Sequence, residues 1–281
     1  MGGSGGGSDS KSITAPSHTT NNLPFVASLL ALGSSPSSQL LDLYPHADFI
    51  MDLDVDGFLT NSKVLEERVQ SHGFRSLWLP LAVDTEVFKP EEVSLGGNYE
   101  HIDMVYVGQY SPTKTHLKQM LVEASEFAKE RGLNFTIYGH AWGSYGHEFT
   151  GTGVLDHWIG VLPLGDLSSV YNSASLVLGT TEEAQEELGM VNNRVFEALA
   201  CSKKILLPVG GREMMDGLTR VFGQDLERVG IHVTDTNVGS VKGNLASIWE
   251  GGKGGNAEGR LEVEETHNWD RRVRRVVEWV R

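Results

Sequence analysis

The sequence predicts an α/β fold. A partial α/β domain over residues 23–99 is followed by a doubly wound, Rossmann-like parallel sheet over residues 100–281. From Asp103 onward, short apolar segments that suit strands alternate with amphipathic segments that suit helices. The segments that follow the strands are rich in glycine and polar residues. Because ligands of such sheets bind at the carboxyl ends of the strands, we expect the functional site in these loops.

The N-terminal part predicts few elements. Residues 1–22 are rich in Gly, Ser, Thr and Asn, so we expect a disordered tail or an added linker. A strand at 58–60, a helix over 62–70 capped by Ser62, and a strand at 76–79 follow. At roughly 30 residues per βαβ unit, residues 23–99 hold two or three units. A partner chain or a further N-terminal portion would then cover the open edge of this sheet.

The C-terminal part predicts a regular pattern. We expect strands at 104–107, 135–138, 175–178 and 205–207. Helices are expected over 115–131, after a cap at Asp166, from Val191, and at the end of the chain. The glycine-rich stretch 251–255 is interpreted as a plain loop, because no strand leads into it as a phosphate-binding loop requires.

The helix after Val191 carries the strongest functional signal. At about 100° per residue, one stripe of this helix holds polar groups, namely Asn193, Arg194, Glu197 and Cys201. The opposite side is apolar: Val195, Phe196, Leu199 and Ala200. Free N–H groups and the dipole at the helix start favour a diphosphate, and Arg194 adds a donor to it. An ionised Glu197 offers enough lone pairs for both hydroxyls of a ribose. The alternative is an ordinary amphipathic helix whose polar face meets water.

Four segments carry a family resemblance. Residues 189–201 resemble the donor-site helix of group 1 GT-B glycosyltransferases, closest to the CgeB-like branch named after a spore-maturation protein. Residues 79–90 are similar to the segment that joins the two GT-B domains, and residues 138–142 and 267–271 also resemble CgeB-like sequences. The resemblance implies a GT-B-like fold that binds a nucleotide-sugar donor, with no cofactor and no metal.

The resemblance also implies roles for single residues. It assigns Glu197 to the ribose of the donor and Lys114 to the diphosphate as the catalytic group, where an ammonium stabilises the departing charge. Gly108, Gln109, Gly139, His140, Asn193 and Arg194 complete the implied donor site. The alternative for Lys114 is a solvated lysine beside a helix start.

Three positions depart from the family pattern. Gln109 stands where many members have arginine, Gly189 where many have an acid, and Ser202 where glycine is usual. Because Gln109 lacks the positive charge of an arginine, the sequence supports phosphate binding more strongly than full catalytic competence.

Metal sites are not expected. The run from Asp52 to Asp56 copies half of an EF-hand loop, but Lys63 occupies the position of its bidentate glutamate. The same run contains the Asp-x-Asp of metal-dependent GT-A enzymes, outside the part of the chain that carries the donor helix. His140, His147 and His157 lack the spacing of zinc ligands.

Other polar groups are interpreted as structural. We expect Cys201 to be a small, semi-buried residue, and we expect a solvated loop at Glu182, Glu183, Glu186 and Glu187. The arginines Arg271, Arg272, Arg274 and Arg275 are expected on the solvated face of a terminal helix.

Composition limits the possible partners. A formal net charge of −14 argues against nucleic acid, whose phosphates require clustered cations. No apolar run in the sequence is long enough to span a bilayer, and a single cysteine fits the reducing cytoplasm.

The sequence therefore predicts a metal-independent glycosyltransferase that acts on an unknown acceptor. A non-catalytic nucleotide-sugar-binding protein is the alternative, and a sugar-nucleotide epimerase would need acid and base residues that no motif supplies.

Overall fold

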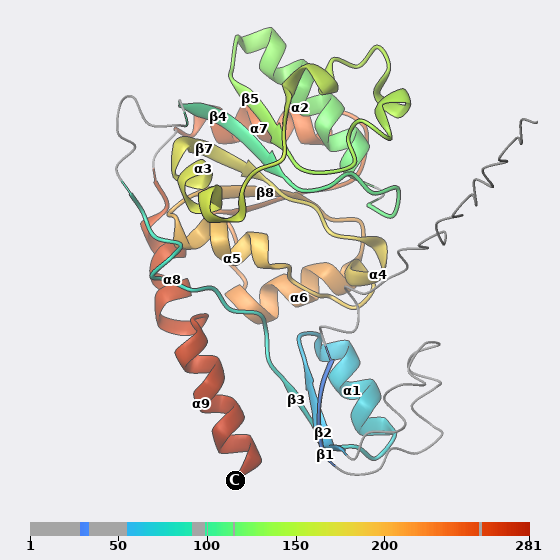
Figure 1. The fold of residues 1–281 in the computed structure, drawn as a ribbon, viewed down its shortest axis with the longest axis vertical. Helices are drawn as coiled ribbons and strands as arrows, with labels where there is room; N and C mark the ends of the chain where they lie inside the picture. Colours follow the sequence, from blue (N-terminus) through green and yellow to red (C-terminus); the bar gives the residue numbers. More distant parts are fainter. Residues whose placement is uncertain (1–28, 34–54, 92–98, 100, 115, 253–254) are drawn as a thin grey trace, which may run out of the picture.

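A computed structural model describes residues 29–33, 55–91, 99, 101–114, 116–252 and 255–281. The chain forms a small N-terminal sheet and a large C-terminal sheet (Figure 1). The predicted tail at 1–22 and the aspartates at 52 and 54 lie outside the described residues.

The small sheet has the strand order β1 (Leu29–Gly33), β2 (Val55–Thr60), β3 (Ser76–Trp78). Strand β2 pairs antiparallel with β1 and parallel with β3. Helix α1 (Lys63–Ser71) joins β2 to β3, and the Ser62 hydroxyl accepts a hydrogen bond from the Leu65 amide at 3.0 Å. The predicted helix and its cap are confirmed, whereas the antiparallel strand β1 was not expected.

The large sheet is parallel throughout its described strands. Their order is β6 (Trp158–Gly160), β5 (Phe135–Tyr138), β4 (Ile102–Val107), β7 (Ala174–Leu178), β8 (Lys204–Pro208) and β9 (Ile231–Thr234). In chain order this is 3-2-1-4-5-6, the arrangement of dinucleotide-binding folds. The winding reverses between β4 and β7, so the loops after these two strands diverge and leave room for a ligand.

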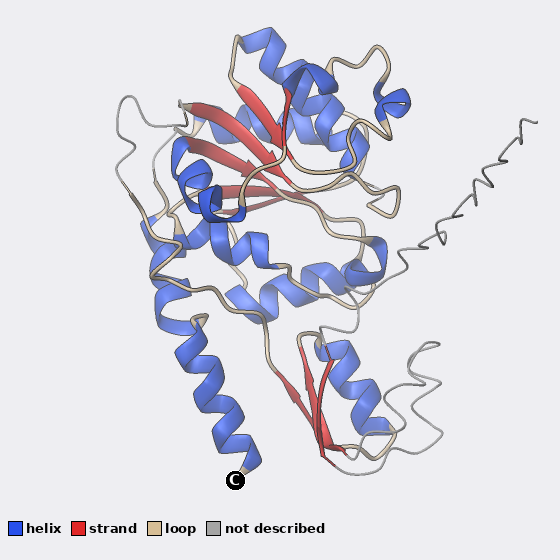
Figure 2. Cartoon of the chain, viewed as in Figure 1, coloured by secondary structure: helices blue, strands red, loops and turns tan. Residues whose placement is uncertain are grey.

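Helices cover both faces of the large sheet (Figure 2). One core lies under α2 (Leu117–Arg131) and α7 (Ser240–Glu250). The other core lies under α3 (Leu167–Ser173), α5 (Asn193–Ala200), α6 (Arg212–Phe222) and α8 (Ala257–Thr266). Strand β4 shows why both faces must be covered: Met104 and Tyr106 pack into the first core, and Val105 packs into the second. The predicted doubly wound sheet is confirmed.

Short helical segments complete the connections. They are η4 (Gly146–Phe149), η5 (Val154–His157), η6 (Leu164–Asp166) and α4 (Glu183–Glu186). Asp166 precedes α3 as predicted, but its side chain accepts a hydrogen bond from the Tyr99 hydroxyl at 2.7 Å instead of capping the helix.

The last helix, α9 (Trp269–Val280), leads from the large sheet back to the small one (Figure 1). Arg272 at its start is only 4% exposed and donates to the carbonyl oxygens of Pro80 at 2.6 Å and Leu81 at 3.1 Å. Near its end, the Arg75 guanidinium lies 4.8 Å from the ring centroid of Trp279. Helix α9 therefore holds in place the segment around Pro80 and Leu81, which leads away from the small sheet.

Arg272 corrects one expectation from the sequence. The arginine cluster was expected to be solvated, and Arg271 and Arg274 are indeed exposed. Arg272 is buried instead, because backbone carbonyls on the joining segment replace its water. Burial and the nearby charge of Arg275 lower the pKa of Arg272 to about 10.

Candidate functional site

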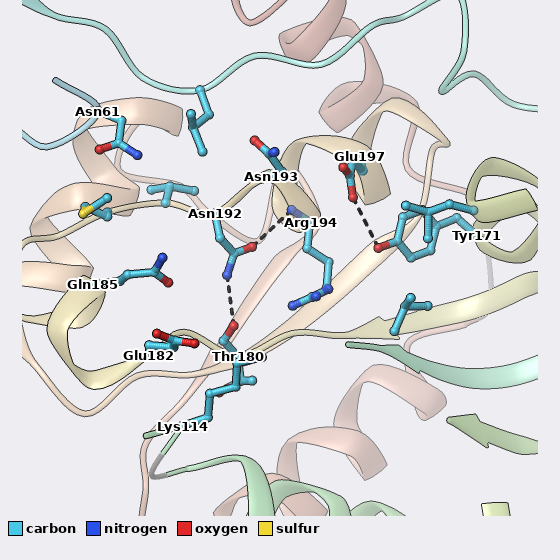
Figure 3. A pocket seen from close by; sticks show the side chains of 15 residues that line it. Asn61, Lys114, Tyr171, Thr180, Glu182, Gln185, Asn192, Asn193, Arg194 and Glu197 are labelled. Carbon is cyan, nitrogen blue, oxygen red and sulfur yellow. Dashed lines mark hydrogen bonds between the residues drawn. The ribbon is translucent and has the colours of Figure 1, made fainter. Parts of the chain in front are cut away.

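A pocket of about 490 Å³ opens where the winding of the large sheet reverses. Val107 at the end of β4, Thr180 after β7 and the first turn of α5 line it. Figure 3 shows polar side chains from these segments pointing toward one another around the pocket. The structure thus has a polar pocket at the place where the sequence predicts ligand binding.

The loop after β7 holds the start of α5 in place. The Asn192 side chain accepts a hydrogen bond from the Arg194 amide at 3.1 Å and donates one to the Thr180 carbonyl at 3.0 Å. Asn192 is therefore both the N-cap of α5 and a link to β7. Asn193, Arg194 and Glu197 all line the pocket, as the predicted polar stripe requires. The predicted apolar residues of α5 are at most 1% exposed: Val195, Phe196, Leu199 and Ala200.

The end of α5 explains one departure from the family pattern. Ser202 has a φ of 57°, in the left-handed region that favours glycine. The amides of Ser202 and Lys203 donate to the carbonyls of Leu199 and Ala198, each at 2.9 Å, which is the Schellman arrangement of a helix end. Serine therefore keeps the glycine geometry at some cost in backbone strain.

Glu197 sits against Tyr171, a pocket residue that the sequence did not single out. The Tyr171 hydroxyl donates to Glu197 Oε2 at 3.5 Å. Burial raises the pKa of Glu197, while the charge of Arg194 and the Tyr171 hydrogen bond oppose that rise. The carboxylate is thus partly desolvated and oriented toward the pocket, which suits it to accept hydrogen bonds from ligand hydroxyls.

Lys114 and Arg194 place two cationic side chains in this pocket. Lys114 is half-buried, and its ammonium donates to the Gln109 carbonyl at 3.2 Å. Burial and the charge of Arg194 lower the pKa of Lys114 to about 8, against an opposing effect of Glu182. An anion in the pocket would relieve the repulsion between the two cations, so the pair favours a ligand with two or more negative oxygens.

Two glycines of the predicted donor site, Gly108 and Gly139, lie next to each other, and Gly108 is close to Arg194. A β-carbon on Gly108 would lie 2.8 Å from the Tyr106 hydroxyl oxygen and 3.0 Å from Arg194 Nη2, so a larger residue would require these side chains to shift. Gly139 has a φ of 147°, and a β-carbon on it would lie 2.0 Å from the Gly108 carbonyl oxygen. The loops after β4 and β5 therefore touch through glycine backbone. Gly108, Gln109, Gly139 and His140 do not line the described pocket, and donor contacts by them stay a prediction.

The acidic group after β7 was expected to be solvated, and this is wrong for Glu186. Glu186 is 7% exposed and accepts from the Gly210 amide at 2.8 Å, with His116 Nε2 at 3.2 Å from its other oxygen. Glu182 lines the pocket beside Gln185. The partners of Glu186 come from distant loops, which local sequence does not reveal.

Cys201 is fully buried rather than semi-buried, and burial raises the pKa of its thiol to about 12. A thiol of that kind does not supply a nucleophile. Within the described residues, no group of three or more His, Cys, Asp or Glu side chains could hold a metal ion. The helices of that part of the chain are all too short or too polar to cross a membrane.

Asn61 is another pocket residue that the sequence did not single out. It follows β2 of the small sheet, so this sheet contributes to the wall of a pocket built mainly by the large one. Its position at the carboxyl end of a predicted strand was the signal that could have found it.

The fold and the site together define the GT-B class, in which a Rossmann-like unit faces a second α/β unit across a ligand pocket. Residues 118–278 match the family described as "Glycosyl transferase-like", and the chain belongs to that family. A search among curated proteins found no match.

Solved structures support the fold assignment. Sucrose-phosphate synthase from Thermosynechococcus elongatus is 14% identical, with a TM-score of 0.58 over 79% of this chain. A glycosyltransferase from Rickettsia africae is 11% identical, with a TM-score of 0.57 over 88% of this chain and 67% of its own. The pneumococcal O-GlcNAc transferase GtfA, solved with UDP and GlcNAc, is 15% identical, with a TM-score of 0.57 over 80% of this chain.

The chain is shorter than each of these three relatives. It spans 57% of the synthase and 45% of the pneumococcal enzyme.

Proposed function

We propose that this chain is the donor-binding part of a metal-independent glycosyltransferase of the CgeB-like branch, and that a nucleotide-activated sugar occupies the pocket at the start of α5. The observation that supports this most strongly is the convergence of Lys114, Arg194 and Glu197 on one pocket at the switch point of a parallel sheet. Two cations and a carboxylate match the two chemistries of a nucleoside diphosphate, which are its anionic phosphates and its ribose hydroxyls.

In this proposal the diphosphate lies over the first turn of α5, between Arg194 and Lys114, where free N–H groups add to their charge. The ribose hydroxyls donate to Glu197. An acceptor hydroxyl attacks the anomeric carbon of the sugar, the new glycosidic bond forms, the bond from that carbon to the phosphate oxygen breaks, and the hydroxyl proton is released. Lys114 and Arg194 stabilise the negative charge that grows on the leaving diphosphate.

We further propose that residues 23–99 are part of the acceptor-side domain and that residues 100–281 form the donor domain. A partner chain or a further N-terminal portion would complete the acceptor side in this proposal, because the described residues of the small sheet supply three strands. A solved complex of GtfA and GtfB is among the similar structures, with a TM-score of 0.58 and 12% identity. The single buried cysteine fits a cytoplasmic protein.

The second candidate function is a nucleotide-sugar-binding protein without turnover. Gln109 favours it, because an amide cannot supply the charge that an arginine would place near the leaving group. Under either function the donor binds, so binding tests the shared part of the proposal and turnover separates the two.

The experiment is a thermal-shift screen of the chain against nucleotide sugars and the matching nucleoside diphosphates, because a ligand of the folded state raises Tm. We expect a shift with a subset of them, lost in Arg194→Met and kept in Arg212→Met, since the Arg212 side chain is 87% exposed and lies outside the pocket. No shift with any ligand, or equal loss in both variants, would overturn the proposal.

Turnover is followed by release of nucleoside diphosphate. We expect the isolated chain to turn over far more slowly than about 1 per second, the lower end of the usual kcat range. Faster steady turnover would exclude the second candidate function.

A further inference from the structure

Asn61 stands apart from the other polar groups of the pocket. It comes from the small sheet, whereas Lys114, Arg194 and Glu197 come from the large one. Figure 3 shows Asn61 on the same side as Gln185 and Glu182, away from Glu197 and Tyr171 on the other side, with Arg194 between them. A ligand that spans the pocket from Glu197 past Arg194 therefore ends near Asn61.

The side-chain oxygen of Asn61 is buried and has no hydrogen-bond partner among the residues that the structure describes. Buried polar atoms in proteins nearly always have a partner, because a buried acceptor without one costs its full desolvation penalty. Asn61 itself lines the polar pocket. A donor group on a bound ligand would satisfy it.

The backbone around Asn61 is fixed. Thr60 and Ser62 on either side are 1% and 0% exposed. The Ser62 hydroxyl donates to the Leu188 carbonyl at 2.5 Å, in the segment that leads from α4 into α5. This hydrogen bond joins the segment of Asn61 to the segment that precedes α5, and it holds Asn61 at the pocket wall.

The chemistry of Asn61 restricts what it can bind. Ionised phosphate oxygens carry no hydrogen and cannot donate to an amide oxygen. The cations that attract phosphate lie elsewhere in the pocket, and Glu197 already faces the ribose in the proposed function. The sugar hydroxyls and the N–H groups of the base can donate to the Asn61 oxygen. The base is bonded to the ribose and therefore lies on the Glu197 side, whereas the sugar lies at the other end of the diphosphate, on the Asn61 side.

We propose that Asn61 is a specificity-determining residue that accepts a hydrogen bond from a hydroxyl of the donor's sugar. This rests on the proposed function. The donor then contacts both sheets, whereas the nucleoside diphosphate alone contacts only the large one. Asn61 thus favours binding of the intact donor over binding of the nucleoside diphosphate that remains after transfer.

The test compares Asn61→Ala with the wild-type chain by calorimetric titration, using two probe pairs: UDP-glucose with UDP, and GDP-mannose with GDP. For the pair that the wild type binds, we expect Asn61→Ala to weaken nucleotide-sugar binding about fivefold, the value of one neutral hydrogen bond. Nucleoside-diphosphate binding should stay within about twofold. Asn237→Ala, in an exposed turn outside the pocket, is the matched control and should change neither affinity.

Stability gives an independent measurement. Because the Asn61 oxygen has no partner among the described residues, Asn61→Ala should leave the Tm of the unliganded chain unchanged or raise it, as removal of a functional residue often does. A fall in Tm with equal loss of both ligands would mean that Asn61 is a structural residue. Unchanged nucleotide-sugar affinity would overturn this inference alone. A wild type that binds no nucleotide sugar, either here or in the thermal-shift screen, would instead overturn the proposed function, and this inference with it.

Discussion

Replacing Glu197 by glutamine tests the proposed ribose contact. Burial raises the pKa of Glu197, yet its carboxylate lines the pocket, with the Tyr171 hydroxyl as its hydrogen-bond donor. Glutamine keeps the shape and one oxygen but replaces the second acceptor by a donor. A bound ribose therefore loses one charge-assisted hydrogen bond, worth about 1.5–3 kcal/mol. That range corresponds to roughly a 10- to 150-fold weaker affinity.

The assay is calorimetric titration of a nucleoside diphosphate and its 2′,3′-dideoxy analogue into the wild type and Glu197→Gln. If Glu197 binds the ribose, loss of the hydroxyls weakens binding to the wild type and has little effect on the variant, because the contact is already gone. The exposed Glu187→Gln is the matched control. Equal losses for both proteins, or a change below about threefold for Glu197→Gln, would refute the ribose contact.

Three further predictions follow from the same structure. Lys114 has a pKa of about 8 and attracts phosphate only when charged, so nucleoside-diphosphate affinity should fall as pH rises through 8. Lys114→Met should remove this pH dependence, and a variant that retains it would contradict the role of Lys114. Ser202→Gly should raise the free energy of unfolding in urea by about 1 kcal/mol, because glycine adopts the φ of 57° without strain. A loss of stability would show that contacts of the serine side chain outweigh the relief of backbone strain. Donor binding should be equal in EDTA and in Mn²⁺ or Mg²⁺, and loss in EDTA with recovery on adding metal would favour a GT-A-type mechanism.

The interior of the large sheet was predictable from sequence because its strands are buried on both faces. Strands β4, β5, β7 and β8 are mostly apolar and almost entirely buried, so they are easily recognised. The edge strands β6 and β9 were missed, since β6 is three residues long and half-exposed, and β9 includes the polar residues His232 and Thr234. Edge strands carry less of the apolar signal on which such predictions depend.

The site was predictable where one helix carried it. Helical periodicity alone places Asn193, Arg194 and Glu197 on one face, and they share the pocket. Asn61 and Tyr171 reach that pocket from segments distant in sequence, so no local pattern joins them to α5. The buried Glu186 was missed for the same reason, because its partners follow other strands.

The return of α9 to the small sheet has a mechanical consequence. The polypeptide passes between the two sheets once through residues 79–91 and again through α9, and Arg272 joins the two passages. Because Arg272 donates to two carbonyl oxygens of the first passage, a change in the angle between the two sheets would have to move both passages together. A fluorophore attached after Arg281 would therefore follow the small sheet, although the chain before it builds the large one (Figure 1).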